Sequence, residues 1–315
     1  IKTGKTRKDV VPILIAESWK RSREADVDSF DFPASSYLSP SELQVRREAK
    51  KHMIDIAYPI MESIYSSLEK TRYMVVLYDA QGYHLLRIGG RKDLQRSLQF
   101  KIREGLCFEE HVVGTCGFSL AKHNKMAIQI IGCEHYSALL HYVTGSYAPI
   151  LSAEENKLIG VLGVTGARTT PNDHTKAIVI AAAKAIENLI RLDKSRRDQF
   201  ILAKFLQITM DSLEDGVIVS NKDNQIVGMN SVAQKIFRVK DFSGLHMSDL
   251  KHCEDIQQAA VQCLNSTKKN APRETNCQIH GNMYLAGIKA LKQVDQGIQG
   301  IVVQLKNVRK MAQIF

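Results

Sequence analysis

Cysteine and histidine side chains near the middle of the chain are the residues best suited to chemistry. Cys107, His111 and Cys116 lie close together in the sequence, and Cys133 and His135 follow them. Thiolate and imidazole ligands suit zinc or a redox iron site, and a cysteine beside a histidine could act as an activated thiol. The intervals match no zinc-finger or zinc-ribbon spacing, and small buried cysteines are ordinary in a sheet domain. We therefore expect no metal site and no cofactor here.

A glycine-rich loop could cradle the phosphates of a nucleotide. The nearest such stretch is Gly89 to Lys92, which lacks the Gly-x-x-x-x-Gly-Lys-[Ser/Thr] pattern. We interpret it as the turn that leads from a hairpin into a loop. The chain is therefore expected to have no ATPase activity and not to be an enzyme.

The composition is that of a globular protein with room for two domains. The 315 residues are 44% hydrophobic and include 19 Gly and 7 Pro, so ordinary cores can form. The 43 Lys and Arg outnumber the 33 Asp and Glu, which gives a net charge of +10, but no DNA-binding motif accompanies them. The sequence contains no long apolar run, no secretory signal and no Cys-x-x-Cys pair. We expect a cytoplasmic protein with reduced thiols, no membrane contact and no DNA contact by this segment.

The first part of the chain, residues 1–71, is expected to form N-terminal helices. An apolar stripe around Trp19 predicts a helix over residues 7–25. A second helix is expected over residues 41–71, with Pro59 as a kink or as the boundary between two helices. Strand patterns begin only after these helices.

Residues 72–172 have the pattern of an antiparallel sheet domain with added helices. Short runs rich in β-branched and aromatic residues alternate with turn residues, as a hairpin requires. Helices are expected over residues 110–122 and 134–140. The expected strands are residues 73–78, 83–88, 127–131, 142–150 and 157–165.

A long helix over residues 173–213 is expected to link this domain to a second one. Apolar and small residues recur along it at alternating spacings of four and three, and a charged stretch at 193–198 interrupts them. This seam predicts that the helix joins two copies of the chain in a homodimer; the alternative is a packing helix within one chain. The candidate dimerisation residues are Ile178, Ala182, Ala185, Leu189 and Leu192.

Residues 214–315 are expected to form a second sheet domain, which makes the whole chain α+β. Asn230 is placed to cap a helix over residues 231–239. Another helix is expected over residues 255–265. The expected strands are residues 217–220, 225–229, 275–279, 284–291 and 299–305.

The stretch from Gly105 to Ile150 resembles the GAF-domain core of bacterial activators related to the acetoin-catabolism and dihydroxyacetone-kinase-operon regulators. Their pattern Gly-x-x-Trp-x-Glu-x-x-x-Gly-Thr-Asn is matched in register by Gly105, Phe108, Glu110, Gly114, Thr115 and Cys116. Their later Gly-x-Glu-His-Phe element, with the His, Trp, Cys and Ala-Pro-Ile that follow it, is similar to Gly132, Glu134, His135, Tyr136, His141, Val143, Gly145 and Ala148–Ile150. Glu17 to Ser22 looks like the Ser-Trp-x-Arg-Ser signature near their N-terminus.

The resemblance implies a small-molecule pocket beside the segment that begins at Glu110. The side chains that would line it are Glu110, Thr115, Cys116, Glu134, His135 and Tyr136. Glu134 and His135 could instead satisfy backbone groups of their own loop. Because the family pattern is broken at Phe108, Cys116, Val143 and Gly145, no family ligand carries over. The signal could be a small metabolite or a regulatory protein such as a dihydroxyacetone-kinase-like subunit.

The segment from Asp215 through Asn230 to Gly244 and Leu245 resembles a PAS domain more loosely. Together the two resemblances imply the sensory region of a sigma-54-dependent activator. DNA and sigma-54 RNA polymerase would then be contacted only by an AAA+ ATPase and a helix-turn-helix domain that this chain does not contain. His246 and His252 could ligate haem, but a lone histidine is usually exposed or packed, so we expect no cofactor in this domain.

Two other functions remain open. The sensory module of a histidine kinase or of a cyclic-nucleotide enzyme shares the GAF–PAS order. A thiol-dependent GAF reductase would use Cys107 or Cys116 beside His111.

Overall fold

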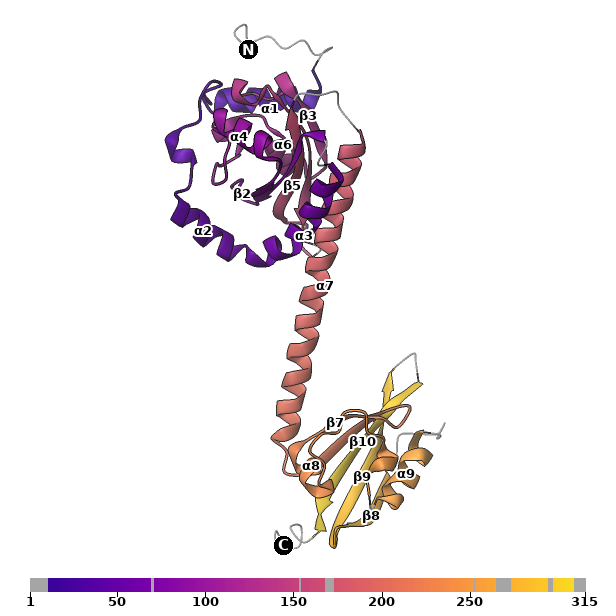
Figure 1. Ribbon diagram of the computed structural model, residues 1–315. Coiled ribbons are helices and arrows are strands. Elements are labelled where there is room, and N and C mark those ends of the chain that lie inside the picture. The colour runs from indigo at the N-terminus through magenta and orange to yellow at the C-terminus, as the bar shows by residue number, and fades with distance from the viewer. Residues whose placement is uncertain are drawn as a thin grey trace. The chain divides into compact units, whose positions relative to one another are not determined.

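The computed structural model describes residues 11–68, 71–152, 154–167, 173–251, 253–264, 273–293 and 297–308. The chain divides between Ser195 and Arg196 into two compact units, and each contains a five-stranded antiparallel sheet with helices (Figure 1). The expected α+β fold class is therefore confirmed. Among the described helices, none combines the length and the apolar character that a membrane span requires.

The sheet of the first unit has the strand order β2-β1-β5-β4-β3, and all its neighbours are antiparallel. β1 and β2 form the expected hairpin, and β1 then pairs with β5 from Tyr73 opposite Gly166 to Asp79 opposite Gly160. The five expected strands agree with the observed ones to within two residues at each end. The strands are β1 (Tyr73–Asp79), β2 (His84–Ile88), β3 (Ile128–Ile131), β4 (Val143–Leu151) and β5 (Leu158–Ala167).

The two faces of this sheet bury separate cores. Helices α3 (Lys51–Leu68) and α7 (Asp173–Asp211) cover one face, where they pack against alternate residues such as Val75 and Leu77 (Figure 1). The residues between them, including Val76, face the other side. There they meet α1 (Ile13–Glu24), α6 (Gly117–Asn124) and the loops that join the strands.

The N-terminal helices begin and end at other residues than the sequence pattern predicts. Residues 7–10 lie outside the described chain, and α1 begins only at Ile13, because Pro12 has an extended conformation with ψ of 141°. The expected helix over 41–71 is two helices, α2 (Pro40–Ala49) and α3, which meet at Lys50. Pro59 lies inside α3 and does not end it; it is exposed, so water can reach the carbonyl that its missing N–H leaves free.

The helix expected over residues 110–122 is interrupted. It consists of α5 (Glu110–Val113) and α6, because Gly114 adopts a φ of 72° and Cys116 is extended. The helix expected over residues 134–140 is likewise replaced by two short 3₁₀ turns, Gly132–Glu134 and Ala138–Leu140. Only the existence of helical structure near these residues was predicted correctly.

One helix of the first unit escaped the sequence analysis altogether. α4 (Arg91–Gln99) begins inside the stretch from Gly89 to Lys92 that we interpreted as a turn into a loop, so that interpretation was wrong for Arg91 and Lys92. Gly90 is its N-cap residue, and only Ser97 is fully buried. Only two of its nine residues, Leu94 and Leu98, are apolar, so a search for apolar runs passed over it.

The sheet of the second unit has the strand order β7-β6-β10-β9-β8 and is also antiparallel throughout. As predicted, Asn230 caps α8 (Ser231–Phe237), with its side chain accepting from the N–H of Ala233. α8 and α9 (Glu254–Leu264) pack with the sheet in one apolar core. The strands are β6 (Gly216–Asn221), β7 (Ile226–Met229), β8 (Arg273–Ile279), β9 (Asn282–Gln293) and β10 (Gly297–Asn307).

Candidate functional site

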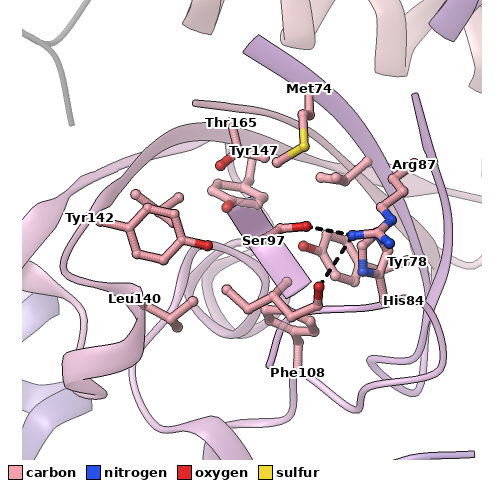
Figure 2. Close-up of a pocket in the computed structure, with 13 residues that line it drawn as sticks. Met74, Tyr78, His84, Arg87, Ser97, Phe108, Leu140, Tyr142, Tyr147 and Thr165 are labelled. Carbon is pink, nitrogen blue, oxygen red and sulfur yellow. Dashed lines mark hydrogen bonds between the residues drawn. The ribbon is translucent and has the colours of Figure 1, made fainter. Parts of the chain in front are cut away.

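A small cavity lies in the first unit between the sheet and α4, and Figure 2 shows the side chains around it. Its volume is about 30 Å³, which is room on the order of one or two water molecules. The wall comes from four strands, from α4 and from the loops that follow α4 and precede β4. The lining residues are Met74, Val76, Tyr78, His84, Arg87, Ser97, Ile102, Phe108, Leu140, Tyr142, Val143, Tyr147 and Thr165.

Arg87 is the charged group of this wall. Its Nη1 donates to Ser97 Oγ at 2.6 Å and to the carbonyl of Ile102 at 3.2 Å, and both bonds are drawn in Figure 2. The carboxylate of Glu104 accepts from the backbone N–H of Arg87, and its salt bridge is with Arg47, with Nη2 to Oε2 at 2.8 Å. Arg87 thereby ties β2 to α4 and to the loop behind it, which fixes one side of the cavity.

His84 is buried in the aromatic part of the wall. Its ring centroid lies 5.0 Å from that of Tyr78 and 5.9 Å from that of Phe108. Burial, together with the nearby positive charge of Arg87, lowers the pKa of His84 to about 3. The imidazole is therefore neutral at physiological pH.

Tyr142 separates the cavity from the protein surface. Its ring stacks on Phe100 with centroids 3.7 Å apart, and the guanidinium of Arg96 lies 5.5 Å from the ring centroid. The Tyr142 hydroxyl points into the cavity (Figure 2). It is buried, and within the described parts of the chain no group forms a hydrogen bond with it. On its outer side, Tyr142 also lines an open cleft of about 630 Å³ with Arg96 and Phe100.

Tyr147 forms the floor of the cavity in a space made by glycines. A methyl group added to Gly117 or Gly145 would overlap its ring, and one added to Gly163 would lie 2.6 Å from it. Because these three positions are glycines, their backbone can approach the Tyr147 ring closely. This leaves space for the whole ring inside the sheet domain. Burial raises the pKa of Tyr147, so its hydroxyl stays protonated.

Two of the six candidate ligand residues, Glu110 and Thr115, contact helix α1, and a third, Cys116, caps the helix α6. Arg21 donates to both carboxylate oxygens of Glu110, at 2.7 and 3.0 Å. Ser18 also donates to Glu110, and its hydroxyl lies 2.8 Å from that of Thr115. Cys116 is buried and caps α6 through its sulfur, which accepts from the N–H of Ser119.

The other three candidates lie in the loop after β3. The Glu134 carboxylate accepts from the backbone N–H of Ile131, and its own carbonyl accepts from the indole of Trp19 at 2.7 Å. His135 is buried, with Nδ1 2.9 Å from the carbonyl of Gly132. Tyr136 packs on Gly114, and its N–H donates to the carbonyl of Thr115.

Three of the six candidates, Glu110, Thr115 and Glu134, form hydrogen bonds with α1. All six are described, and none of them lines the cavity shown in Figure 2. Their role in ligand binding stays a prediction. The alternative role that the sequence left open, satisfying backbone groups, is what Glu134 and His135 do here.

Cys107 and Cys116, the two thiols considered for chemistry, are both buried. In the described part of the chain, no cluster of three potential metal ligands is found. Burial raises the pKa of Cys116 to about 12 and also raises that of Cys107, so neither is present as a reactive thiolate at neutral pH. In the second unit His246 precedes a short 3₁₀ turn, and His252 lies outside the described residues.

The five candidate dimerisation residues fall on two sides of α7. Ala182 is buried against the first unit's sheet core and Ile178 packs on that core. Ala185, Leu189 and Leu192 lie on the exposed side, and the two leucines are 45% and 48% exposed. Only the second group is free to meet another molecule.

The sequence analysis missed the residues that line the cavity. His84 and Arg87 lie in a strand that was predicted correctly, and Tyr142 directly precedes another. Ionisable residues inside a short buried strand are a usable signal, because such a strand otherwise selects apolar side chains. The contribution of α4 had no signal, since that helix was not predicted.

Comparison with known proteins places the chain among bacterial regulators. Residues 1–188 match the model of the family described as MimR, N-terminal domain. The chain is 28% identical over 229 residues to a signal-transduction and transcriptional-control protein of Clostridium beijerinckii, covering 72% of this chain and 36% of that protein. It is 26% identical over 239 residues to the acetoin dehydrogenase operon transcriptional activator AcoR of Bacillus subtilis, covering 75% and 38%. The chain thus spans little more than a third of the length of these curated relatives.

A solved structure resembles nearly the whole chain. It is that of the Escherichia coli DhaR(N)–DhaL complex, which matches with a TM-score of 0.81 and 19% sequence identity and covers 94% of this chain and 99% of that chain. At this identity the likeness shows a common fold. The family match covers more than half of the chain. The chain therefore belongs to the family of the MimR N-terminal domain.

Proposed function

We propose that this chain is the signal-receiving region of a sigma-54-dependent transcription activator. The observation that carries the proposal is the family match over residues 1–188, because the curated relatives matched with it include operon transcriptional activators. The fold supports it, since both units have their counterpart in DhaR(N). Remodelling of sigma-54 RNA polymerase and contact with DNA would then be the work of other domains of the full-length protein.

The signal is a small metabolite or a regulatory protein. A protein signal is supported by the DhaR(N) structure, which was solved in complex with DhaL. By that analogy the partner of this chain would be a dihydroxyacetone-kinase-like subunit. The metabolite alternative rests on the resemblance in the sequence, because the cavity of the first unit, at about 30 Å³, has room for only about one or two water molecules.

Helix α1 is the element that we propose to respond to the signal. It packs on the core through Ile15 and Trp19 and is also held by polar contacts of Arg21 and Ser18 with Glu110; these polar contacts can be exchanged for contacts with a partner or for water. Three of the six residues predicted from the sequence, Glu110, Thr115 and Glu134, form hydrogen bonds with this helix. Their proposed role is therefore to hold or release α1, which requires a signal that favours one of the two states.

Helix α7 is proposed to carry the signal between two copies of the chain. One exposed side presents Ala185, Leu189 and Leu192 at spacings of four and three residues, which permits helix pairing. We propose a homodimer that pairs along this side, with the first unit on the opposite side of the helix.

Transcription from the target operon in the native bacterium tests the proposal. The gene is altered to lack the coding sequence for residues 1–213, and a reporter is fused to the operon that the protein controls. We expect the reporter to become independent of the inducer, either always active or always silent. A response to inducer equal to that of the unaltered gene would contradict the proposal, as would a phosphoacceptor-histidine domain encoded directly after Phe315.

A further inference from the structure

The open cleft on the outer side of Tyr142 has the size of a small-molecule site. Its volume is about 630 Å³, which lies within the range of roughly 300–1,000 Å³ that such sites occupy. All the described residues of its wall belong to the first unit. Unlike the inner cavity, the cleft can hold an organic molecule without any movement of the protein.

The register of three neighbouring strands brings the parts of this wall together. β1 begins opposite the end of β5, and β4 begins opposite the same end. Arg72 directly precedes β1, Tyr142 directly precedes β4 and Ala167 ends β5, so all three lie at one end of the sheet. α4 adds Arg96, and Phe100 follows that helix. The cleft is therefore built from segments that are far apart in the sequence.

The surroundings of the cleft are positively charged. The guanidinium groups of Arg72 and Arg96 form part of the described wall, and no aspartate or glutamate belongs to it. Asp93 pairs with Arg72, with Nε to Oδ1 at 3.4 Å. Lys92, four residues before Arg96 on α4, adds a positive charge on the same side of the helix. Three positive groups thus stand against one negative group, which favours an anion as the ligand.

Arg96 has hydrogen-bond donors available for such an anion. Its guanidinium lies 5.5 Å from the centroid of the Tyr142 ring, and in the described part of the chain it forms no ion pair and no hydrogen bond. Contact with an aromatic ring engages the face of a guanidinium and leaves the N–H groups at its edge unoccupied. Those N–H groups match the oxygen atoms of a phosphate or a carboxylate.

The placement of the two guanidinium groups favours phosphate over carboxylate. Arg72 precedes β1 and Arg96 lies on α4, so the two groups reach the cleft from different elements. A planar carboxylate is fully engaged by a single guanidinium in a bidentate pair. A phosphate monoester has three terminal oxygens around one atom and a charge of about −1.5 to −2 at neutral pH, so it can accept from both groups at once.

An aromatic surface next to the charged groups favours an ester over inorganic phosphate. The rings of Phe100 and Tyr142 are stacked, with centroids 3.7 Å apart, and both line the cleft. Ala138 and Ala167 add further apolar surface. The carbon atoms of a ligand would bury apolar area against these side chains while its phosphate meets the guanidinium groups.

We propose that this cleft binds a small organic phosphate monoester, with the phosphate between Arg72 and Arg96 and the carbon part against Phe100 and Tyr142. The role of such a ligand as a signal rests on the proposed sensory function, whereas its binding to the chain does not. The inner cavity behind Tyr142 takes no part in this binding.

Three probes separate the contributions of the phosphate and of the ring: phenyl phosphate, benzoate and inorganic phosphate. Each is titrated into the purified chain in a calorimeter at about 0.15 M salt, where distant charges are screened. Phenyl phosphate is expected to bind at one site, about tenfold or more tightly than either of the others, because each of those lacks part of the contacts. Absence of binding by phenyl phosphate would overturn the proposal. Equal affinity for inorganic phosphate would also overturn it, since that result means an adventitious ion only.

Charge-removing variants place the phosphate. Arg96→Gln and Arg72→Gln should each weaken the binding of phenyl phosphate about tenfold. Arg91→Gln is the matched control, because Arg91 begins the same helix, is exposed and is not part of the cleft wall; its affinity should stay within about twofold of the parent. Arg72 is 61% exposed, so Arg72→Gln should fold like the parent, which its melting temperature checks. Full affinity in both cleft variants, or an equal loss in Arg91→Gln, contradicts the proposal.

A variant of the aromatic wall places the carbon part of the ligand. Phe100→Leu keeps an apolar side chain and removes the ring, so phenyl phosphate should bind about threefold to tenfold more weakly. Binding of inorganic phosphate, measured by competition, should stay unchanged because it makes no contact with the ring. An equal change for both ligands would show that the carbon part does not lie against Phe100, which refutes the proposed placement.

The reporter assay separates this proposal from the sensory function. If phenyl phosphate does not bind while the reporter loses its response to inducer on deletion of residues 1–213, the ligand site is wrong and the sensory function stands. If phenyl phosphate binds as expected and the reporter response survives the deletion, the cleft is a binding site and the sensory function fails.

Discussion

Arg21 in α1 and Glu110 at the start of α5 form a bidentate ion pair, with Nε to Oε2 at 2.7 Å and Nη2 to Oε1 at 3.0 Å. The two residues are far apart in the sequence, and their side chains are only 33% and 20% exposed. Because the same carboxylate also accepts from Ser18, one acidic residue holds the N-terminal helix to the sheet domain at two points. The pair therefore joins the two stretches on which the family resemblance rests.

Glu110→Gln is expected to lower the free energy of unfolding by about 1–3 kcal/mol, because it removes the ion pair and leaves Arg21 half-buried without its acceptor. Urea unfolding of the purified chain measures the loss. Glu24→Gln is the control, since its ion pair with Lys20 is exposed and should be worth less than about 1 kcal/mol. A double-mutant cycle with Arg21→Gln should give a coupling above about 0.5 kcal/mol; additivity would show that the pair contributes nothing.

Gly117→Ala is expected to destabilise the chain by about 1–3 kcal/mol, because the added methyl overlaps the ring of Tyr147 and neither group can move in the packed core. Gly287→Ala in β9 is the control, because no atom lies within 4 Å of the position of its new methyl. The melting temperatures of the two variants give the comparison. Equal stability of Gly117→Ala and the parent would mean that the ring has more room than the structure shows.

The unfolding free energy should fall in mild acid because of two buried histidines. Burial lowers the pKa of His135 to about 4 and that of His84 to about 3, whereas both titrate near 6.5 in the unfolded chain. Below pH 6.5 the unfolded state therefore binds protons that the folded state does not, so stability that is present above pH 6.5 is lost as the pH falls towards these values. Each histidine should cost about 2 kcal/mol between pH 6.5 and pH 5.

His135→Asn isolates one of these two contributions. The amide can still donate to the Gly132 carbonyl but does not titrate. Urea unfolding at pH 6.5 and pH 5 should show a pH-dependent loss that is smaller by about 2 kcal/mol than in the parent chain. An identical loss in both proteins would show that His135 is protonated in the folded state.

Leu189→Asp tests the proposed pairing along α7. A charge at this exposed leucine would be buried in the seam of a dimer, so the molecular mass in solution should change from that of a dimer to that of a monomer. Ser195→Asp puts the same charge on the same helix away from the seam and should leave a dimer. Light scattering at equal concentrations measures the mass of both variants. An unchanged dimer mass for Leu189→Asp would show that the dimer does not pair along this face of α7.

The sheets were predicted from the sequence more accurately than the helices. Strands such as β1 alternate between two buried faces and are bounded by turn residues, so their signal is local. The breaks at Lys50 and Gly114 and the whole of α4 had weaker signals, because each depends on packing with distant segments. The α1 contacts could not be derived at all. Nothing local in the sequence shows that Arg21 will meet Glu110.

The candidate site shows the same limit. A family pattern predicts which residues matter but not what they touch, and Glu134 and His135 were equally compatible with a pocket and with a loop. The cavity requires residues from four strands, one helix and two loops to meet. Only the tertiary fold brings these elements close together, so the positions of His84 and Tyr142 at the cavity could be found only once the fold was known.

The space around Tyr147 has a consequence for evolution. Gly117, Gly145 and Gly163 surround a single ring, so these four positions form one unit on which selection acts jointly. A larger residue at any of the glycines becomes acceptable only after the tyrosine has been replaced by a smaller side chain. Among homologues, the four positions should therefore change together or not at all. A lineage that shrinks the ring would also enlarge the cavity above it.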